Sequence, residues 1–273
     1  MIAQTPNLDD IIGVGGVELQ LVFDYGLVFF LHTIRLSAFL LSAPFFGAAS
    51  IPVQVRVMVS ILISVSLFGK VEVPDPQTLP FLLLVEVIMV EIAMGLLLGL
   101  ILTVLFSSVA LAGEKVASSA GLGFAAQVDP NLGGQTPVIS QLLNLFGIAL
   151  FLAMDGHLVC IALIKGSYDL MPLGRPFNFQ ALIASGLTSG GHMFSMASLL
   201  SFPIVAILLL ANITVGVITR SAPQLNLFSF GFPLTILACF FALYFATTPM
   251  AFATRDLLNF ILEFLETSIQ GSA

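Results

Sequence analysis

The stretch PFLLLVEVIMVEIAMGLLLGLILTVLFSSVALA, residues 80–112, decides the fold, because Glu86 and Glu91 are its only charged side chains. As one helix it is about 50 Å long at 1.5 Å per residue, well beyond the ~30 Å hydrocarbon core of a bilayer. Such a helix tilts strongly, breaks, or extends beyond the bilayer among other helices. In each case lipid or protein must cover it, and we expect an integral membrane protein.

The composition of the whole chain has the same character. Of 273 residues, 58% are hydrophobic and 8% are charged, whereas a soluble domain is about a quarter charged. The net charge is −7 and the 8 Lys and Arg residues stand singly, which argues against nucleic acid as a partner. Cys160 and Cys239 lack metal-ligand or redox spacing, so we expect small core residues, no metal site and no cofactor.

Further apolar runs separated by Gly/Pro loops predict an all-α protein of membrane-associated helical hairpins. They cover residues 21–46, 53–68, 138–164, 192–219 and 227–250. The run at 192–219 is expected to be interrupted at Pro203. The run at 53–68 is short for a membrane span. The loops hold too few basic residues for the positive-inside rule, so membrane topology stays open.

The tail, residues 251–269, is predicted to form an amphipathic helix. One face is apolar and the acidic side chains lie elsewhere. The apolar positions are Leu257, Leu258, Ile261, Leu262 and Leu265.

Gly95 and Gly99 form a GxxxG step inside the long run. This spacing lets two helix backbones approach closely, so we expect another helix to lie against these glycines. The alternative is a glycine-rich apolar helix without specific pairing.

Four ionisable residues inside apolar runs are expected to be buried polar groups: Glu86, Glu91, Asp155 and His157. A carboxylate facing lipid is costly, so both glutamates should face protein or water. Asp155 and His157 either form a proton relay or make separate structural hydrogen bonds. Residues i and i+2 do not face each other on a helix, so a relay needs a helix break at Gly156.

The segment LAGEKVASSAGLGFAAQVDPNLGGQ, residues 111–135, is the most unusual, because glycine concentrates near its centre and end. It lacks the context of a phosphate-binding loop. Non-helical backbone at membrane depth is tolerated only where protein buries it or it lines a cavity. We expect a loop in a pore or vestibule; the alternative is an ordinary connector outside the membrane.

Residues 220–226, RSAPQLN, join two apolar runs. Arg220 suits a helix C-terminus and Pro223 prevents continuation of the helix. We expect a tight turn closing a helical hairpin, with Arg220, Pro223, Gln224 and Asn226 in contact with a partner.

The chain resembles the FliR family of flagellar biosynthetic proteins in nearly its whole length and in the same order. The carrying motifs are GLGFAAQVDP at 121–130, QTPV at 135–138, DGH at 155–157, the pattern from Asn212 through RSAPQLNLF at 220–228, and GFP at 231–233. Arg35, Ala43-Pro44, Ile51-Pro52 and Arg56 also fit. Injectisome homologues share the fold; the Asp155–His157 and Gly121 motifs favour the flagellar branch.

The resemblance implies a subunit of the flagellar type III export gate in the bacterial inner membrane, at the flagellar basal body. It implies a FliP-like unit, residues 1–175, followed by a FliQ-like helical pair and an amphipathic helix, residues 176–273. The implied partners are FliP-like, FliQ-like and FlhB-like proteins, unfolded export substrates and membrane lipid. In the family a glycine-rich loop is thought to plug the closed channel, which here implicates Gly113, Gly121, Leu122, Gly123, Phe124, Val128, Gly133 and Gly134.

Two other function classes compete with the export gate. A small-solute secondary transporter would have a midplane site at Asp155 and His157 or near Pro203, but such transporters often show paired internal repeats, and we see none. An enzyme is not expected, because the sequence has no metal triad, nucleophile elbow or cofactor fingerprint.

Overall fold

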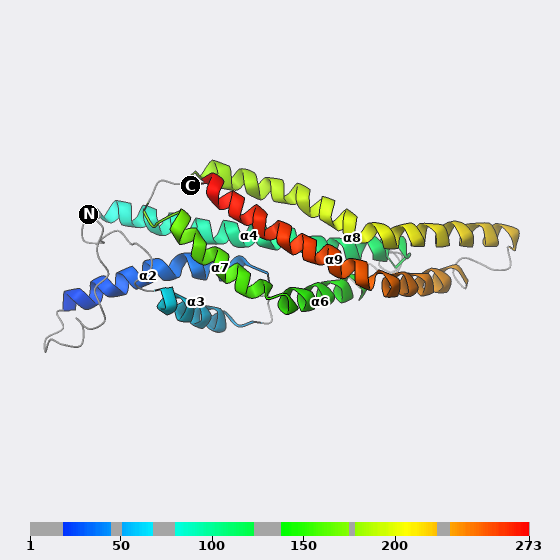
Figure 1. Cartoon of the computed structure of the whole chain (residues 1–273), viewed down its shortest axis with the longest axis horizontal. Helices are drawn as coiled ribbons and strands as arrows, with labels where there is room; N and C mark the ends of the chain where they lie inside the picture. Colours follow the sequence, from blue (N-terminus) through cyan, green and yellow to red (C-terminus); the bar gives the residue numbers. More distant parts are fainter. Residues whose placement is uncertain are drawn as a thin grey trace, which may run out of the picture. The chain divides into compact units, whose positions relative to one another are not determined.

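A computed structural model of the chain describes residues 19–44, 51–67, 80–122, 138–174, 178–222 and 230–272. The regular elements in these ranges are helices (Figure 1), in agreement with the all-α prediction. They are α2 (Leu19–Ser42), α3 (Val53–Leu67), α4 (Phe81–Ser119), α6 (Val138–Ala153), α7 (Gly156–Leu170), α8 (Phe179–Ser221) and α9 (Phe232–Ser272).

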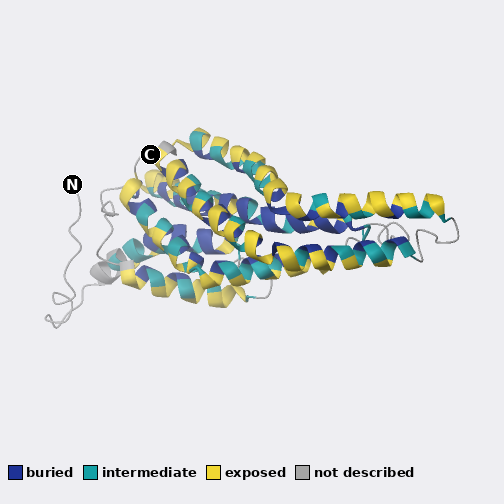
Figure 2. Cartoon of the chain, turned by 45° about the vertical axis from the view of Figure 1, so that its right-hand side comes forward, coloured by how far each residue is buried: buried dark blue, intermediate teal, exposed yellow. Residues whose placement is uncertain are grey.

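Four helices in the described residues are long and apolar enough to cross a membrane, namely α2, α4, α8 and α9. The number rises to 5 if α6 and α7 form one broken span. Much of these helices is exposed (yellow in Figure 2). The exposed residues include many large apolar side chains, and examples on α8 are Leu187, Phe202 and Leu210. Apolar side chains on this scale need lipid or partner protein around them, so the protein is membrane-embedded.

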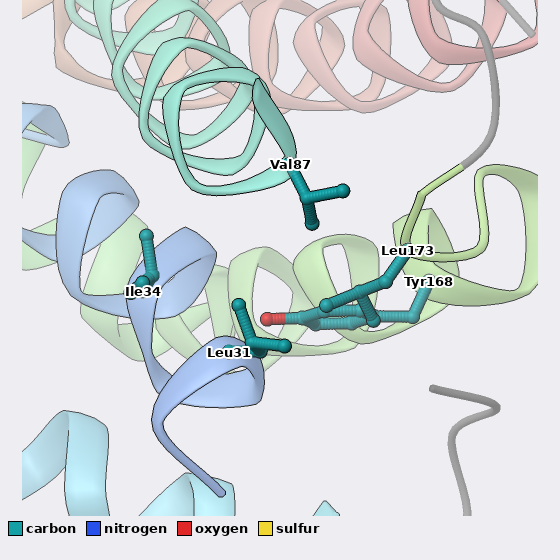
Figure 3. Packing of buried hydrophobic residues seen from close by; sticks show 5 residues of the cluster. All are labelled: Leu31, Ile34, Val87, Tyr168 and Leu173. Atoms are coloured by element: carbon teal, nitrogen blue, oxygen red, sulfur yellow. The ribbon is translucent and has the colours of Figure 1, made fainter. Parts of the chain in front are cut away.

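The chain divides into two compact units. The first comprises residues 1–103, 158–189 and 262–273. In it α2 packs against α3, where Ser37 Oγ donates to Ser60 Oγ at 2.9 Å. Its apolar cluster joins α2, α4 and α7, as Figure 3 shows for Leu31, Ile34, Val87, Tyr168 and Leu173.

The second unit comprises residues 104–157 and 190–261. Here α4 packs closely on α6: the Cγ1 atom of Val109 lies 3.0 Å from where a Cβ on Gly147 would stand. The rings of Phe106 and Phe151 meet edge to face, with centroids 5.8 Å apart. The expected division into residues 1–175 and 176–273 rests on similarity to partner subunits and stays a prediction.

Three element predictions were wrong in detail. The helix α4 continues to Ser119, so residues 111–119 are helical rather than the start of a loop. The helix α8 runs through Pro203 without interruption. A proline removes one backbone hydrogen bond, and at membrane depth local adjustment and neighbouring groups can compensate for it.

The third error concerns the run at 138–164, which is two helices separated at Met154 and Asp155. Asp155 has a φ of 57°, in the left-handed region, and its N–H bonds to Leu152 O at 3.1 Å. The break therefore falls at Met154 and Asp155, directly before Gly156, the position at which a proton relay would need one.

The predicted amphipathic tail is part of α9, which is continuous from Phe232 to Ser272. Of the five predicted apolar positions, four are buried, namely Leu257, Leu258, Ile261 and Leu265, and Leu262 is half-buried. Asp256, Glu263 and Glu266 are exposed. This burial pattern agrees with the predicted apolar face.

Candidate functional site

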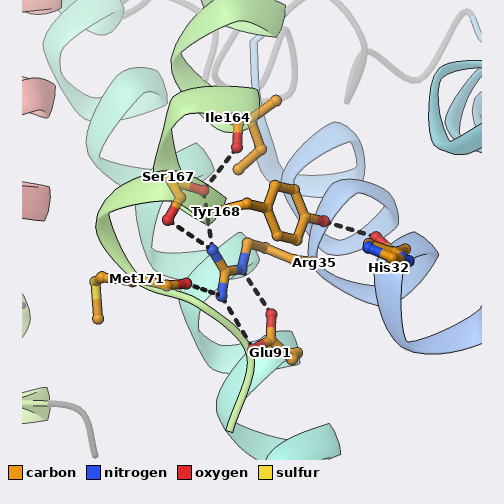
Figure 4. A network of polar contacts seen from close by, with 7 residues as sticks. All are labelled: His32, Arg35, Glu91, Ile164, Ser167, Tyr168 and Met171. Carbon is orange, nitrogen blue, oxygen red and sulfur yellow. Dashed lines mark hydrogen bonds and ion pairs between the residues drawn. The ribbon is translucent and has the colours of Figure 1, made fainter. Parts of the chain in front are cut away.

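The strongest polar arrangement in the described structure is centred on Arg35, which lies on α2 and is 1% exposed (Figure 4). Its Nε donates to Glu91 Oε2 at 2.6 Å and its Nη2 donates to Glu91 Oε1 at 3.0 Å. Glu91, on α4, is also 1% exposed. The two bonds form the bidentate geometry in which arginine and carboxylate interact most strongly.

The remaining guanidinium hydrogens reach the end of α7. Nη1 donates to Ser167 O at 3.0 Å and to Ser167 Oγ at 3.1 Å, and Nη2 donates to Met171 O at 3.0 Å. Ser167 O also accepts the Met171 N–H at 2.9 Å, so Arg35 adds a second donor to this carbonyl and a side-chain donor to Met171 O, close to the helix end. With the two bonds to Glu91, all five N–H donors of the side chain are used.

Tyr168 completes this group. Arg35 Cζ lies 4.3 Å from the centre of the Tyr168 ring, and Tyr168 Oη donates to His32 O at 2.6 Å. A cation over an aromatic face is attracted by the ring quadrupole. We call Arg35, Glu91, Ser167, Tyr168 and Met171 the Arg35 cluster. This cluster can fix α2, α4 and α7 in one register. Its side chains include no activated nucleophile.

Gly95 and Gly99 lie against α2. A Cβ on Gly95 would meet the carbonyl of Arg35 and would stand 2.7 Å from Ala38 Cβ. A Cβ on Gly99 would meet Ser42 Oγ and would stand 2.9 Å from Ala43 N. Most of the neighbouring atoms belong to the backbone, which cannot move aside as a flexible side chain can. The helix partner of this GxxxG step is therefore within the same chain.

The glycine-rich segment is described only as far as Leu122. Gly113 is part of α4, where a Cβ would stand 2.5 Å from Ser140 Cα, so its placement in a loop was wrong and it serves close packing on α6. Gly123, Phe124, Val128, Gly133 and Gly134 lie outside the described residues.

The helix α4 ends in a Schellman motif built on Gly121, whose φ is 82°. The Leu122 N–H bonds to Ala117 O at 3.0 Å and the Gly121 N–H bonds to Ser118 O at 3.1 Å. This pair of bonds requires a left-handed residue at the turn, which glycine adopts without the Cβ clash of other residues. The glycine-rich segment thus begins with a defined helix stop.

The other predicted polar residues do not form a site. Glu86 and Asp155 are exposed within the single chain, so the chain does not itself bury them, and their burial in an assembly stays a prediction. No hydrogen bond joins Asp155 to His157 in the described structure, where the buried His157 Nδ1 has no hydrogen-bond partner. Gly156 packs on Phe151, whose Cδ2 would stand 2.5 Å from an added Cβ.

Two remaining predictions concern the hairpin and metals. Arg220 is exposed in the last turn of α8, while Pro223, Gln224 and Asn226 lie outside the described residues. Within the described ranges no group of three His, Cys, Asp or Glu side chains is placed to hold a metal ion.

Sequence reasoning missed the Arg35 cluster as a unit. It identified Glu91 as a carboxylate that must face protein, but it did not pair it with Arg35, Ser167 or Tyr168. One signal was present: Arg35 and Glu91 each lie inside a long apolar run, and intramembrane charges generally pair.

Comparison with known proteins gives a consistent result. Residues 27–260 match the family described as bacterial export proteins, family 1. The chain is 31% identical to the flagellar biosynthetic protein FliR of Escherichia coli K12 over 211 residues, covering 77% of this chain and 80% of that protein. It is 32% identical to the FliR protein of Pectobacterium carotovorum over 211 residues, covering 76% and 79%. For the FliR protein of Bacillus subtilis 168 the identity is 28% over 250 residues, covering 89% and 94%.

Proposed function

Since the chain belongs to the family of bacterial export proteins, family 1, we propose that it is a subunit of the flagellar type III protein export gate. In this role it forms part of the channel that passes unfolded flagellar proteins across the cell membrane. The observation that carries the proposal is the family match over residues 27–260, together with flagellar relatives from distant bacteria.

The physical character of the chain supports this role. Exposed apolar helices provide the surface that lipid and neighbouring subunits would cover. The Arg35 cluster is built for rigidity, and a channel subunit needs fixed helices rather than a catalytic group. The proposal includes no enzymatic step.

The proposed assembly partners are FliP-like, FliQ-like and FlhB-like proteins. Residues 1–175 act as the FliP-like unit and residues 176–273 as the FliQ-like helical pair. The hairpin turn at residues 220–226 contacts a partner through its exposed polar residues. The assembly lies in the inner membrane at the flagellar basal body.

The glycine-rich segment after α4 seals the resting channel. Glycines allow a loop to fold tightly in a narrow lumen. Leu122, Phe124 and Val128 supply apolar bulk, and a hydrophobic constriction blocks ions by dewetting. The defined stop of α4 at Gly121 gives this segment a fixed starting point.

Purification in gentle detergent tests the role as a subunit. A tagged full-length chain expressed in its host should elute with several other membrane proteins of the export apparatus in constant ratio. Elution alone or as a homo-oligomer would contradict the proposal and would favour the secondary transporter. The family match already disfavours that alternative.

Deletion of residues 121–124 tests the seal. The complex should still assemble, but cells should leak small ions and solutes when the variant replaces the normal chain. The matched controls are cells that carry the normal chain at the same level and cells without the chain, and both should stay tight. Tight cells with a confirmed assembled variant complex would place the seal elsewhere.

A further inference from the structure

The C-terminal end of α4 is held by side chains from two other helices of the same compact unit. Asn212 Nδ2, on α8, donates to Ser119 O at 2.9 Å. Thr235 Oγ1, on α9, lies 3.2 Å from Ala120 O and donates to it. These are the last two carbonyls of the helix before Gly121.

These two contacts complete the hydrogen bonding of the helix end. The last four carbonyls of an α-helix have no partner within the regular helix. The Schellman motif satisfies Ala117 O and Ser118 O through backbone N–H groups. Asn212 and Thr235 satisfy the two that follow, so each carbonyl from Ala117 to Ala120 has a donor.

The surroundings of Asn212 favour a specific role for its hydrogen bond to Ser119 O. Leu209, Leu210 and Ile213 beside it are 58%, 66% and 56% exposed, so this surface is apolar. An amide side chain on such a surface is costly unless it is hydrogen-bonded, and asparagine is also a weaker helix former than leucine. A leucine would be cheaper at this position if no polar contact were needed.

We propose that Asn212 and Thr235 are positioning residues that hold residues 119–122 in place and thereby fix the point from which the glycine-rich segment leaves α4. This inference rests on the proposed function in one respect: its consequence for sealing requires that the glycine-rich segment is the seal. The anchoring itself does not depend on that role.

The two contacts are unequal. The hydroxyl of Thr235 has one proton and two acceptors within reach, Ala120 O at 3.2 Å and Phe232 O of its own helix at 3.0 Å. It therefore divides its donation between them. Asn212 donates to Ser119 O at a shorter distance without that competition. Loss of the Asn212 amide should have the larger effect.

Hydrogen exchange in the purified full complex tests the anchor. In Asn212→Leu the amides of Gly121 and Leu122 should exchange roughly five- to tenfold faster, the ratio expected for loss of one hydrogen bond. Thr235→Val should give a smaller increase, and Asn212→Gln should recover part of the protection because it keeps the amide. Thr214→Val is the matched control, because within the described residues the Thr214 hydroxyl donates to Leu210 O of its own helix, at 2.9 Å. Exchange in Asn212→Leu equal to that in Thr214→Val would overturn the proposal.

A leak measurement on the same variants tests the consequence. Asn212→Leu should raise the small-ion leak of cells at unchanged complex level, and Asn212→Gln should lower it again. Faster exchange without any leak, in cells where deletion of residues 121–124 does leak, would overturn the positioning role. If cells with that deletion do not leak either, the proposed seal is wrong. The hydrogen-exchange result still shows whether Asn212 holds residues 119–122 in place. Should Asn212→Leu fail to assemble, Thr235→Val is compared with Thr235→Ser, which keeps the hydroxyl that donates to Ala120 O. Exchange at Gly121 and Leu122 should be faster in Thr235→Val than in Thr235→Ser, and equal rates would overturn the proposal.

Discussion

Arg35 and Glu91, 56 residues apart in the chain, share two hydrogen bonds of 2.6 and 3.0 Å while both side chains are almost completely buried. Two buried charges that pair with each other, and with the end of a third helix, tie α2, α4 and α7 together. The pair therefore specifies how these helices meet, whether or not it adds net stability.

Removal of one member of this pair should be strongly destabilising. Arg35→Met or Glu91→Leu leaves an unpaired buried charge, and the expected cost is about 3–5 kcal/mol. The double variant should lose less than either single variant, because neither charge is then left alone. Thermal unfolding of the purified complex measures this. Tyr168→Phe, which removes only the bond to His32 O, is the control and should cost about 1 kcal/mol. Equal stability of all four variants would contradict the account.

The GxxxG step should not tolerate side chains. Gly95→Ala and Gly99→Ala place a Cβ against the backbone of α2 and should destabilise by about 1–3 kcal/mol. Gly26→Ala on α2 is the matched control, because nothing lies within 4 Å of its added Cβ. That variant should be neutral or gain up to ~1 kcal/mol in helix propensity. Recovery of folded chain and its unfolding temperature give the comparison, and equal values for the three variants would contradict close packing.

The helix stop at Gly121 should depend on its backbone conformation. Gly121→Ala must hold an alanine at a φ of 82° and should cost about 1–2 kcal/mol. Gly121→Asn should cost less, since asparagine tolerates this region better. Gly166→Ala, in the interior of α7 with open space around its added Cβ, controls for glycine replacement in general. If Gly121→Ala lowered the unfolding temperature no more than Gly166→Ala does, the left-handed conformation at residue 121 would not be required.

The hairpin turn should lie at a protein contact. A cysteine at Gln224 in the otherwise native complex should form a cross-link with a partner subunit, expected to be FlhB-like, when a short bifunctional reagent is added. The control is a cysteine at Leu187, an exposed apolar position on the same helix, α8, that precedes the turn. Labelling of the Gln224 position by soluble reagents alone would count against the contact.

Sequence patterns predicted the helical class and the long α4 because apolar composition over such lengths has few other solutions. The place of Gly95 and Gly99 against a helix followed from spacing alone, but the identity of that helix did not, since GxxxG carries no information on its partner. The predicted start of the glycine-rich loop, at residue 111, lies too early in the chain, because α4 continues to Ser119. Small residues such as Gly113 and Ala117 are as compatible with helix packing as with a loop.

The polar contacts that hold helix ends could not be predicted. Thr103 Oγ1 donates to Ser42 O at the end of α2, Arg35 donates to the end of α7, and Asn212 donates to the end of α4. Each joins residues more than 60 positions apart in the chain, so no local pattern records it. Only the three-dimensional arrangement shows which carbonyl a lone polar residue in an apolar helix will satisfy.

Export of flagellar proteins in the host bacterium tests the central claim most directly. Cells lacking the chain should assemble no channel and should release no flagellar filament or hook protein into the medium. Expression of the full-length chain should restore release, and expression of Glu91→Leu should restore much less. Undiminished release from cells without the chain, in which synthesis of the exported proteins is verified, would contradict its role as a gate subunit.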